Sequence, residues 1–188
     1  MPKRSPNGGV LIQRLALALL LTSVGGLLPV RASDDLYVRY FGGVADGKPC
    51  YARYYNDAHL KAHPKQTVRR IEIDFDAGWR EDEGGKNTGS DFQAGVGFML
   101  KRSREWYGQE IYCKTVNDHF ECYLDADGGN IRLIPRGDAL RLEVLGGKGS
   151  DIHVEGLNDF GTFGEVGSDD RVFLLPRADR KLCEAPTH

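Results

Sequence analysis

The sequence lacks the short motifs that mark common enzyme and metal-binding classes. It contains no Cys-x-x-Cys pair and no Gly-x-Ser-x-Gly elbow, so it predicts neither a zinc module nor a serine-hydrolase nucleophile. It also has no internal repeat and, beyond the N-terminal region, no apolar run long enough to span a membrane. We therefore predict no cofactor and assign no catalytic residue.

The first 32 residues differ in composition from the rest of the chain. Lys3, Arg4 and Arg14 precede and flank an apolar run that starts at Leu15, and the segment ends in small residues at Ala32. This order is typical of a secretory signal peptide; the alternative is an uncleaved N-terminal membrane anchor. We predict a signal peptide over residues 1–32, a single domain over residues 33–188, and a periplasmic or secreted location.

Loss of this segment changes the charge balance. It holds four of the 25 basic residues and none of the 27 acidic ones, so the formal net charge changes from −2 to −6. Nucleic-acid binding needs clustered positive charge, which a modestly acidic domain does not predict. We expect no nucleic-acid partner, and no membrane span after cleavage.

Four cysteines follow the predicted cleavage site. Cys113 and Cys122 lie in two strand-like runs around Asn117-Asp118, and a two-residue turn there places the two cysteines opposite each other. At such a non-hydrogen-bonded site the Cα atoms approach to roughly 4.5 Å, which a disulfide tolerates. By exclusion Cys50 pairs with Cys183, so we predict two disulfides.

Apolar residues alternate with polar ones along much of the chain. Leu140, Leu142 and Val144 are one example, and Leu36, Val38 and Tyr40 are another. A period of two predicts half-buried strands, and the glycine-rich connections suit a barrel or a sandwich. We predict an all-β fold, a single antiparallel barrel or sandwich of about 8–10 strands with one short helix, stapled by the disulfides.

The predicted helix covers residues 57–63 and carries a histidine pair. His59 and His63 lie four residues apart, so they share one helix face, as metal-binding pairs do. Two histidines form an incomplete site, and no glutamate stands where a zinc protease places one. Two solvated histidines are the favoured interpretation, with a metal site as the weaker one.

Acidic residues give two further weak candidates. Asp125 and Asp127 resemble the start of a calcium loop, but Gly129 and Arg136 replace ligands that such a loop requires. Asp74 and Asp76 follow Glu72 along one predicted strand face, where paired carboxylates would serve a glycoside hydrolase. A solvated strand face is the favoured interpretation of these three acids.

Three stretches together resemble a set of uncharacterised exported proteins of Gram-negative bacteria. They are Cys50-Tyr51-Ala52-Arg53-Tyr54-Tyr55 with His59-Leu60 and His63-Pro64, the run from Cys122 through Asp127-Gly128-Gly129, and Asp169-Asp170-Arg171-Val172-Phe173 before Cys183. That set often has a further cysteine where this chain has Ala126. The resemblance implies export and no particular activity.

These observations favour a periplasmic binding protein over an enzyme. Its partner is an unknown protein or small molecule in the cell envelope, and an inhibitor of an envelope hydrolase is one version. The alternatives are an envelope-directed hydrolase using acids such as Asp74, Asp76 or Asp127, and a structural envelope component. A roomy barrel cavity favours ligand binding inside, whereas a filled core favours recognition at the surface.

Overall fold

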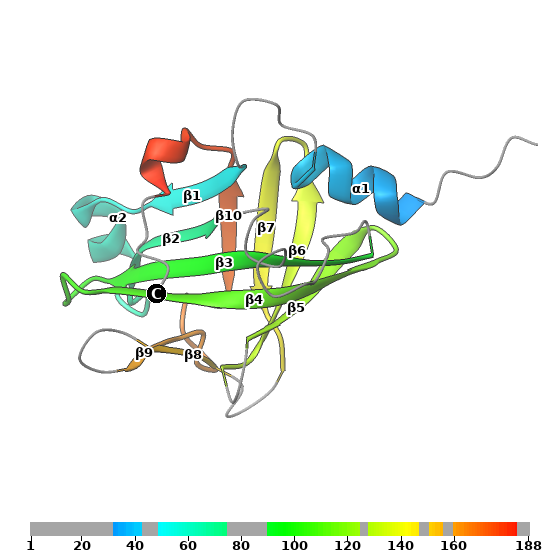
Figure 1. Ribbon diagram of the computed structural model, residues 1–188. Helices are drawn as coiled ribbons and strands as arrows, with labels where there is room; N and C mark the ends of the chain where they lie inside the picture. The colour runs from blue at the N-terminus through cyan, green and yellow to red at the C-terminus, as the bar shows by residue number, and fades with distance from the viewer. Residues whose placement is uncertain are drawn as a thin grey trace, which may run out of the picture.

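The computed structural model describes residues 32–42, 49–74, 90–124, 128–146, 151–155 and 160–183 (Figure 1). The predicted signal peptide, apart from Ala32, lies outside the described residues. So do Asp76, Asp125 and Asp127, and the hypotheses built on them stay predictions.

An eight-stranded antiparallel sheet forms most of the molecule. Its strands, in spatial order, are β1 (Cys50–Tyr54), β2 (Val68–Asp74), β3 (Asp91–Leu100), β4 (Trp106–Val116), β5 (His119–Leu124), β6 (Asn130–Arg136), β7 (Ala139–Val144) and β10 (Val172–Pro176). The first and last strands also meet, through a bridge between Tyr51 and Arg177 and a 2.8 Å hydrogen bond from Ala178 N to Cys50 O. The sheet is therefore a nearly closed barrel, and the predicted all-β fold is confirmed.

The alternating pattern explains why these strands curl around one core. In β7, Leu140, Leu142 and Val144 are at most 6% exposed, whereas Arg141 and Glu143 between them are half-buried and pair with each other. The neighbouring strands β6 and β10 pair with β7 in a matching register, so their buried apolar residues meet those of β7 inside the barrel.

Both predicted disulfides are confirmed. Asn117 takes a φ of 54° in the β4–β5 turn, and this turn pairs Cys113 with Cys122 and Lys114 with Glu121. Cys50 bonds Cys183, which follows the short 3-10 helix η1 (Arg180–Leu182), across a sequence separation of 133. In the chain-entropy model a loop of that length contributes about 5 kcal/mol to stability, against about 2.5 kcal/mol for the hairpin loop.

The predicted strand over residues 36–40 is wrong. This segment belongs to a helix, α1 (Ala32–Tyr40), so the described residues contain two short α-helices where we predicted one. Leu36, Tyr37, Tyr40 and Phe41 recur on one side of a helix and pack on the core, while Val38 is 53% exposed. Apolar residues at 36, 38 and 40 also fit a period of two, so the sequence pattern favoured a strand over this helix.

α1 closes one end of the barrel. The Phe41 ring lies 4.7 Å from that of Phe92 and 5.2 Å from that of Phe120, centroid to centroid. The Tyr40 hydroxyl donates to Gly137 O in the β6–β7 turn, and Tyr40 O accepts from the Tyr51 hydroxyl at 2.9 Å. We call this the α1 end; it also holds the β4–β5 turn.

A small hairpin closes the opposite end. Strands β8 (Ile152–Glu155) and β9 (Phe160–Phe163) pair with each other outside the barrel sheet. Phe163 packs on Phe98 and Phe173, with centroids 4.7 and 5.7 Å away, and Ile152 is fully buried. We call this the α2 end, after the helix α2 (Asp57–Ala62) in the β1–β2 connection; it also holds the β3–β4 and β9–β10 connections. Side chains from both closures belong to the buried core of the barrel.

Candidate functional site

The helix α2 (Asp57–Ala62) opens the β1–β2 connection, close to the predicted range. The Asn56 side chain caps it by accepting from His59 N at 2.9 Å, and Leu60 anchors it to the core. Its last turn ends at His63, immediately before Pro64, which cannot continue a helix. His59 and His63 therefore project from one face, as predicted.

These two histidines form a stack with a tyrosine. The ring centroids of Tyr55 and His59 are 4.6 Å apart, and those of His59 and His63 are 4.3 Å apart. His59 Nε2 lies 3.0 Å from Gln66 Oε1, and His63 Nδ1 lies 3.9 Å from Asp169 Oδ2. Burial raises the pKa of Tyr55 above its usual value. His59 is thus half-buried and hydrogen-bonded, unlike the solvated side chain that we favoured from sequence.

The stacked geometry is unsuited to joint metal binding. Imidazole lone pairs lie in the ring plane, and the His59 and His63 planes are only 22° apart, so their lone pairs do not converge on one ion. Within the described ranges no three histidine, cysteine or acidic side chains gather as metal ligands.

A buried carboxylate holds the loops of the α2 end together. Asp170 is fully buried and accepts hydrogen bonds from Thr67 N and Thr67 Oγ1, both at 2.6 Å, and from Val68 N at 3.2 Å. Lys101 Nζ donates to Pro64 O at 2.9 Å and to Gln66 O at 2.6 Å. These bonds tie the β9–β10, β1–β2 and β3–β4 connections into one rim.

Arg171 shapes the β9–β10 connection from its other side. Its guanidinium donates to Gly164 O at 2.6 Å, Val144 O at 3.0 Å and Gly146 O at 2.8 Å. Gly164 has a φ of 85°, which only glycine adopts without strain. Hydrogen bonds from the Arg171 side chain to backbone carbonyls therefore fix the conformation of this connection.

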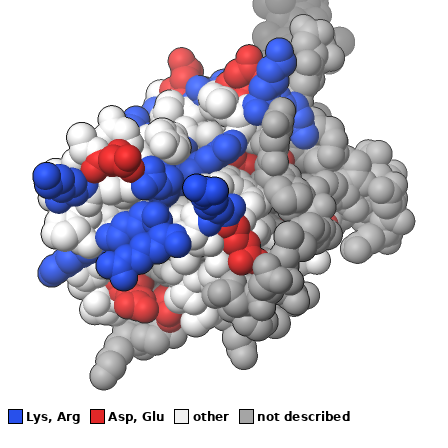
Figure 2. All heavy atoms as spheres, turned by 90° about the vertical axis from the view of Figure 1, so that its left-hand side faces the viewer, with Lys and Arg blue, Asp and Glu red and all other residues white. Residues whose placement is uncertain are grey.

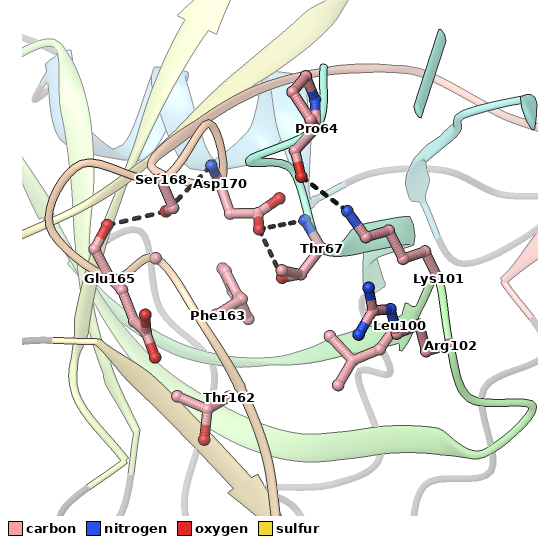
Figure 3. Close-up of a pocket in the computed structure, with 11 residues that line it drawn as sticks. Pro64, Thr67, Leu100, Lys101, Arg102, Thr162, Phe163, Glu165, Ser168 and Asp170 are labelled. Atoms are coloured by element: carbon pink, nitrogen blue, oxygen red, sulfur yellow. Dashed lines mark hydrogen bonds between the residues drawn. The ribbon is translucent and has the colours of Figure 1, made fainter. Parts of the chain in front are cut away.

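The three connections enclose a pocket of about 380 Å³ (Figure 3). Its lining comprises Pro64, Thr67, Leu100, Lys101, Arg102, Thr162, Phe163, Gly164, Glu165, Ser168 and Asp170. Phe163 and Leu100 supply an apolar floor, and Arg102 and Glu165 bring opposite charges to its two sides (Figure 3). This size and mixed lining are typical of small-molecule sites.

Basic side chains gather on the face of the molecule that carries α2 (Figure 2). Exposed cations of this end include Lys61, Lys65, Arg102 and Arg104, and none has an ion-pair partner among the described residues. Because the chain as a whole carries a net negative charge, this end is electrostatically distinct.

A second hollow lies at the α1 end. It is lined by Arg136, Asp138, Ala139, Pro176 and Arg177. All of these but the half-buried Ala139 are exposed, and no buried aromatic ring forms its floor. The pocket at the α2 end is therefore the better candidate site.

The predicted solvated face of β2 is wrong. Glu72 and Asp74 are only 1% and 6% exposed. Arg70 pairs with Glu72 at 3.1 Å and lies 4.8 Å from the centre of the Trp106 ring, which covers Gly97. Carboxylates so enclosed do not present themselves to a large envelope substrate.

No protein-family model matches this chain, and comparisons with curated proteins and with solved structures also return no match. Among the described residues, no helix has the length and apolar character needed to cross a membrane. The function of the pocket is therefore inferred from its residues and their geometry.

Sequence reasoning singled out α2 but missed the pocket beside it. Arg102 lies in the β3–β4 turn, more than 60 residues before Phe163 at the end of β9 and Glu165 just after it, and no local pattern links them. The one available signal was the glycine-rich stretch over residues 156–170, which sequence patterns alone predict as one long connection, and connections of that length often carry a function.

Proposed function

We propose that this chain is an exported binding protein that takes a small ligand in the pocket at the α2 end. The pocket carries this proposal; among the described residues the apolar side chains of the barrel strands cluster in the interior, so we expect recognition at the outer surface. The pocket has a suitable volume, an apolar floor and charged sides. Its walls are held by Asp170 and Lys101, which lowers the cost of ordering on binding.

The two disulfides and the predicted signal peptide support a role outside the cytoplasm. Of the acids that the hydrolase alternative invokes, Asp74 is enclosed, while Asp76 and Asp127 lie outside the described residues. The structural alternative stays a prediction.

Native mass spectrometry of the protein purified from the periplasm tests this function. Thr162 is half-buried in the pocket wall, so Thr162→Phe fills the pocket, and Val172→Phe places the same ring on an exposed strand position outside it. We expect a small molecule to accompany the wild type and the Val172→Phe variant and to be lost from Thr162→Phe. A ligand-free wild type, or a ligand retained equally by both variants, contradicts the proposal.

A further inference from the structure

Two opposite charges face each other across the apolar floor of the pocket. Arg102 comes from the β3–β4 turn on one side, and Glu165 comes from the β9–β10 connection on the other, with Phe163 between them (Figure 3). Both side chains belong to exposed residues, and neither forms an ion pair with another described residue. Within the described part of the chain, the pocket therefore offers one cation and one anion without an ion-pair partner, at separate places.

The neighbouring polar groups are already occupied. Lys101 Nζ donates to two backbone carbonyls, and Asp170 accepts three hydrogen bonds from Thr67 and Val68. The Ser168 hydroxyl donates to Glu165 O at 2.8 Å. Arg102 and Glu165 are thus the two charged groups of the lining whose side chains have no partner among the described residues and can face a ligand.

The order of these groups defines a ligand chemistry. A guanidinium binds a carboxylate through two parallel hydrogen bonds, and a carboxylate binds an ammonium group. Phe163 and Leu100 between them provide area for an apolar chain. A simple anion pairs with Arg102 but is repelled by Glu165. A simple cation pairs with Glu165 but is repelled by Arg102.

We propose that the pocket binds a small zwitterion whose charges are separated by an apolar stretch, as in a short peptide with free termini. Its carboxylate lies against Arg102, its ammonium group against Glu165, and its middle on Phe163. This inference rests on the proposed function, since it names the ligand class of the same pocket.

Three matched probes test this assignment on the full mature chain. 6-Aminohexanoate carries both charges, hexanoate only the negative one and hexylamine only the positive one. Titration calorimetry gives the affinities, and amide NMR shifts of residues 162–168 locate the binding. We expect 6-aminohexanoate to bind roughly tenfold more tightly than either singly charged probe, because each charge-assisted contact adds affinity.

Two substitutions separate the contributions of the charges. Arg102→Gln removes the cation, so the zwitterion is expected to bind no better than hexylamine does to the wild type. Glu165→Gln removes the anion, so its affinity is expected to fall to that of hexanoate. Arg104→Gln is the control, because Arg104 is an exposed cation of the same turn that does not line the pocket.

The outcomes distinguish this inference from the proposed function. If hexanoate binds at the pocket as tightly as 6-aminohexanoate and Glu165→Gln changes nothing, the zwitterion assignment is wrong, while the pocket remains a binding site. If none of the probes shifts residues 162–168, the assignment is also wrong, and the native mass spectrum decides on the proposed function. An equal loss in Arg104→Gln contradicts the assignment as well, because it indicates general charge attraction.

Discussion

The two ends of the barrel are closed by different devices. At the α1 end a helix inserts Tyr40 and Phe41 among the core rings, and both are almost fully buried. At the α2 end the β8–β9 hairpin covers the core with one side, through Ile152 and Phe163. The edge of the same hairpin forms a wall of the pocket.

We infer from this difference that one end of the barrel serves mainly stability and the other mainly ligand recognition. The α1 end is expected to contribute mainly to the free energy of unfolding, because its anchoring residues contact the core. The rim of the α2 end, with Arg102 and Glu165 exposed, is expected to contribute mainly to binding. Substitutions at the two ends test this division.

The largest expected effect is at Phe41. Phe41→Ala removes a ring that is 2% exposed, so we expect the free energy of unfolding to fall by about 3–5 kcal/mol. Urea unfolding measures it. Val38→Ala on the exposed side of the same helix is the control, with an expected change under about 0.5 kcal/mol. Equal effects of the two substitutions would mean that α1 does not close the barrel.

A smaller loss is expected where the hairpin meets the barrel. A Cβ atom added at Gly161 would overlap the ring of Tyr107, so Gly161→Ala is expected to cost about 1–3 kcal/mol of unfolding free energy. The same substitution in a Tyr107→Leu background is expected to cost less, because the ring is gone. An unchanged cost in the double variant would show that the overlap is not its cause.

Alkaline pH is expected to weaken the α1 end. Burial, the largest cause, raises the pKa of Tyr51 to about 12 from its ordinary value of 10.0. The folded state therefore holds this proton more tightly, and its stabilising effect is complete below about pH 10 and lost as the pH rises toward 12. Urea unfolding between pH 8 and pH 12 measures the loss. Tyr51→Phe is expected to flatten that decline, and an unchanged slope would exclude Tyr51 as its source.

The pocket rim is expected to matter least for stability. Arg102→Gln and Glu165→Gln change exposed residues without ion-pair partners among the described residues, so each should alter the free energy of unfolding by under about 0.5 kcal/mol. Urea unfolding checks this. A loss of 2 kcal/mol or more at either position would break the division between the two ends.

Local patterns predicted the barrel better than the site. The Asn117-Asp118 turn fixed the pairing of Cys113 with Cys122, because register follows directly from a two-residue turn. α1 was missed because residues 36, 38 and 40 satisfy a period of two while residues 36, 37, 40 and 41 share a helix side. The pocket was missed because only the closed barrel brings its three connections together.

The seam of the barrel has a consequence for the order in which the chain folds. From β1 to β7 every strand pairs with its neighbour in sequence, so these hairpins form from local contacts. The seam joins Tyr51 to Arg177 and Cys50 to Cys183 and must await the C-terminal residues. Until β10 is made, β1 and β7 are open strand edges, which pair readily with other chains. The nascent chain is therefore expected to be most prone to aggregate until β10 has been made and paired with β7, and a chaperone that shields those edges would act in that interval.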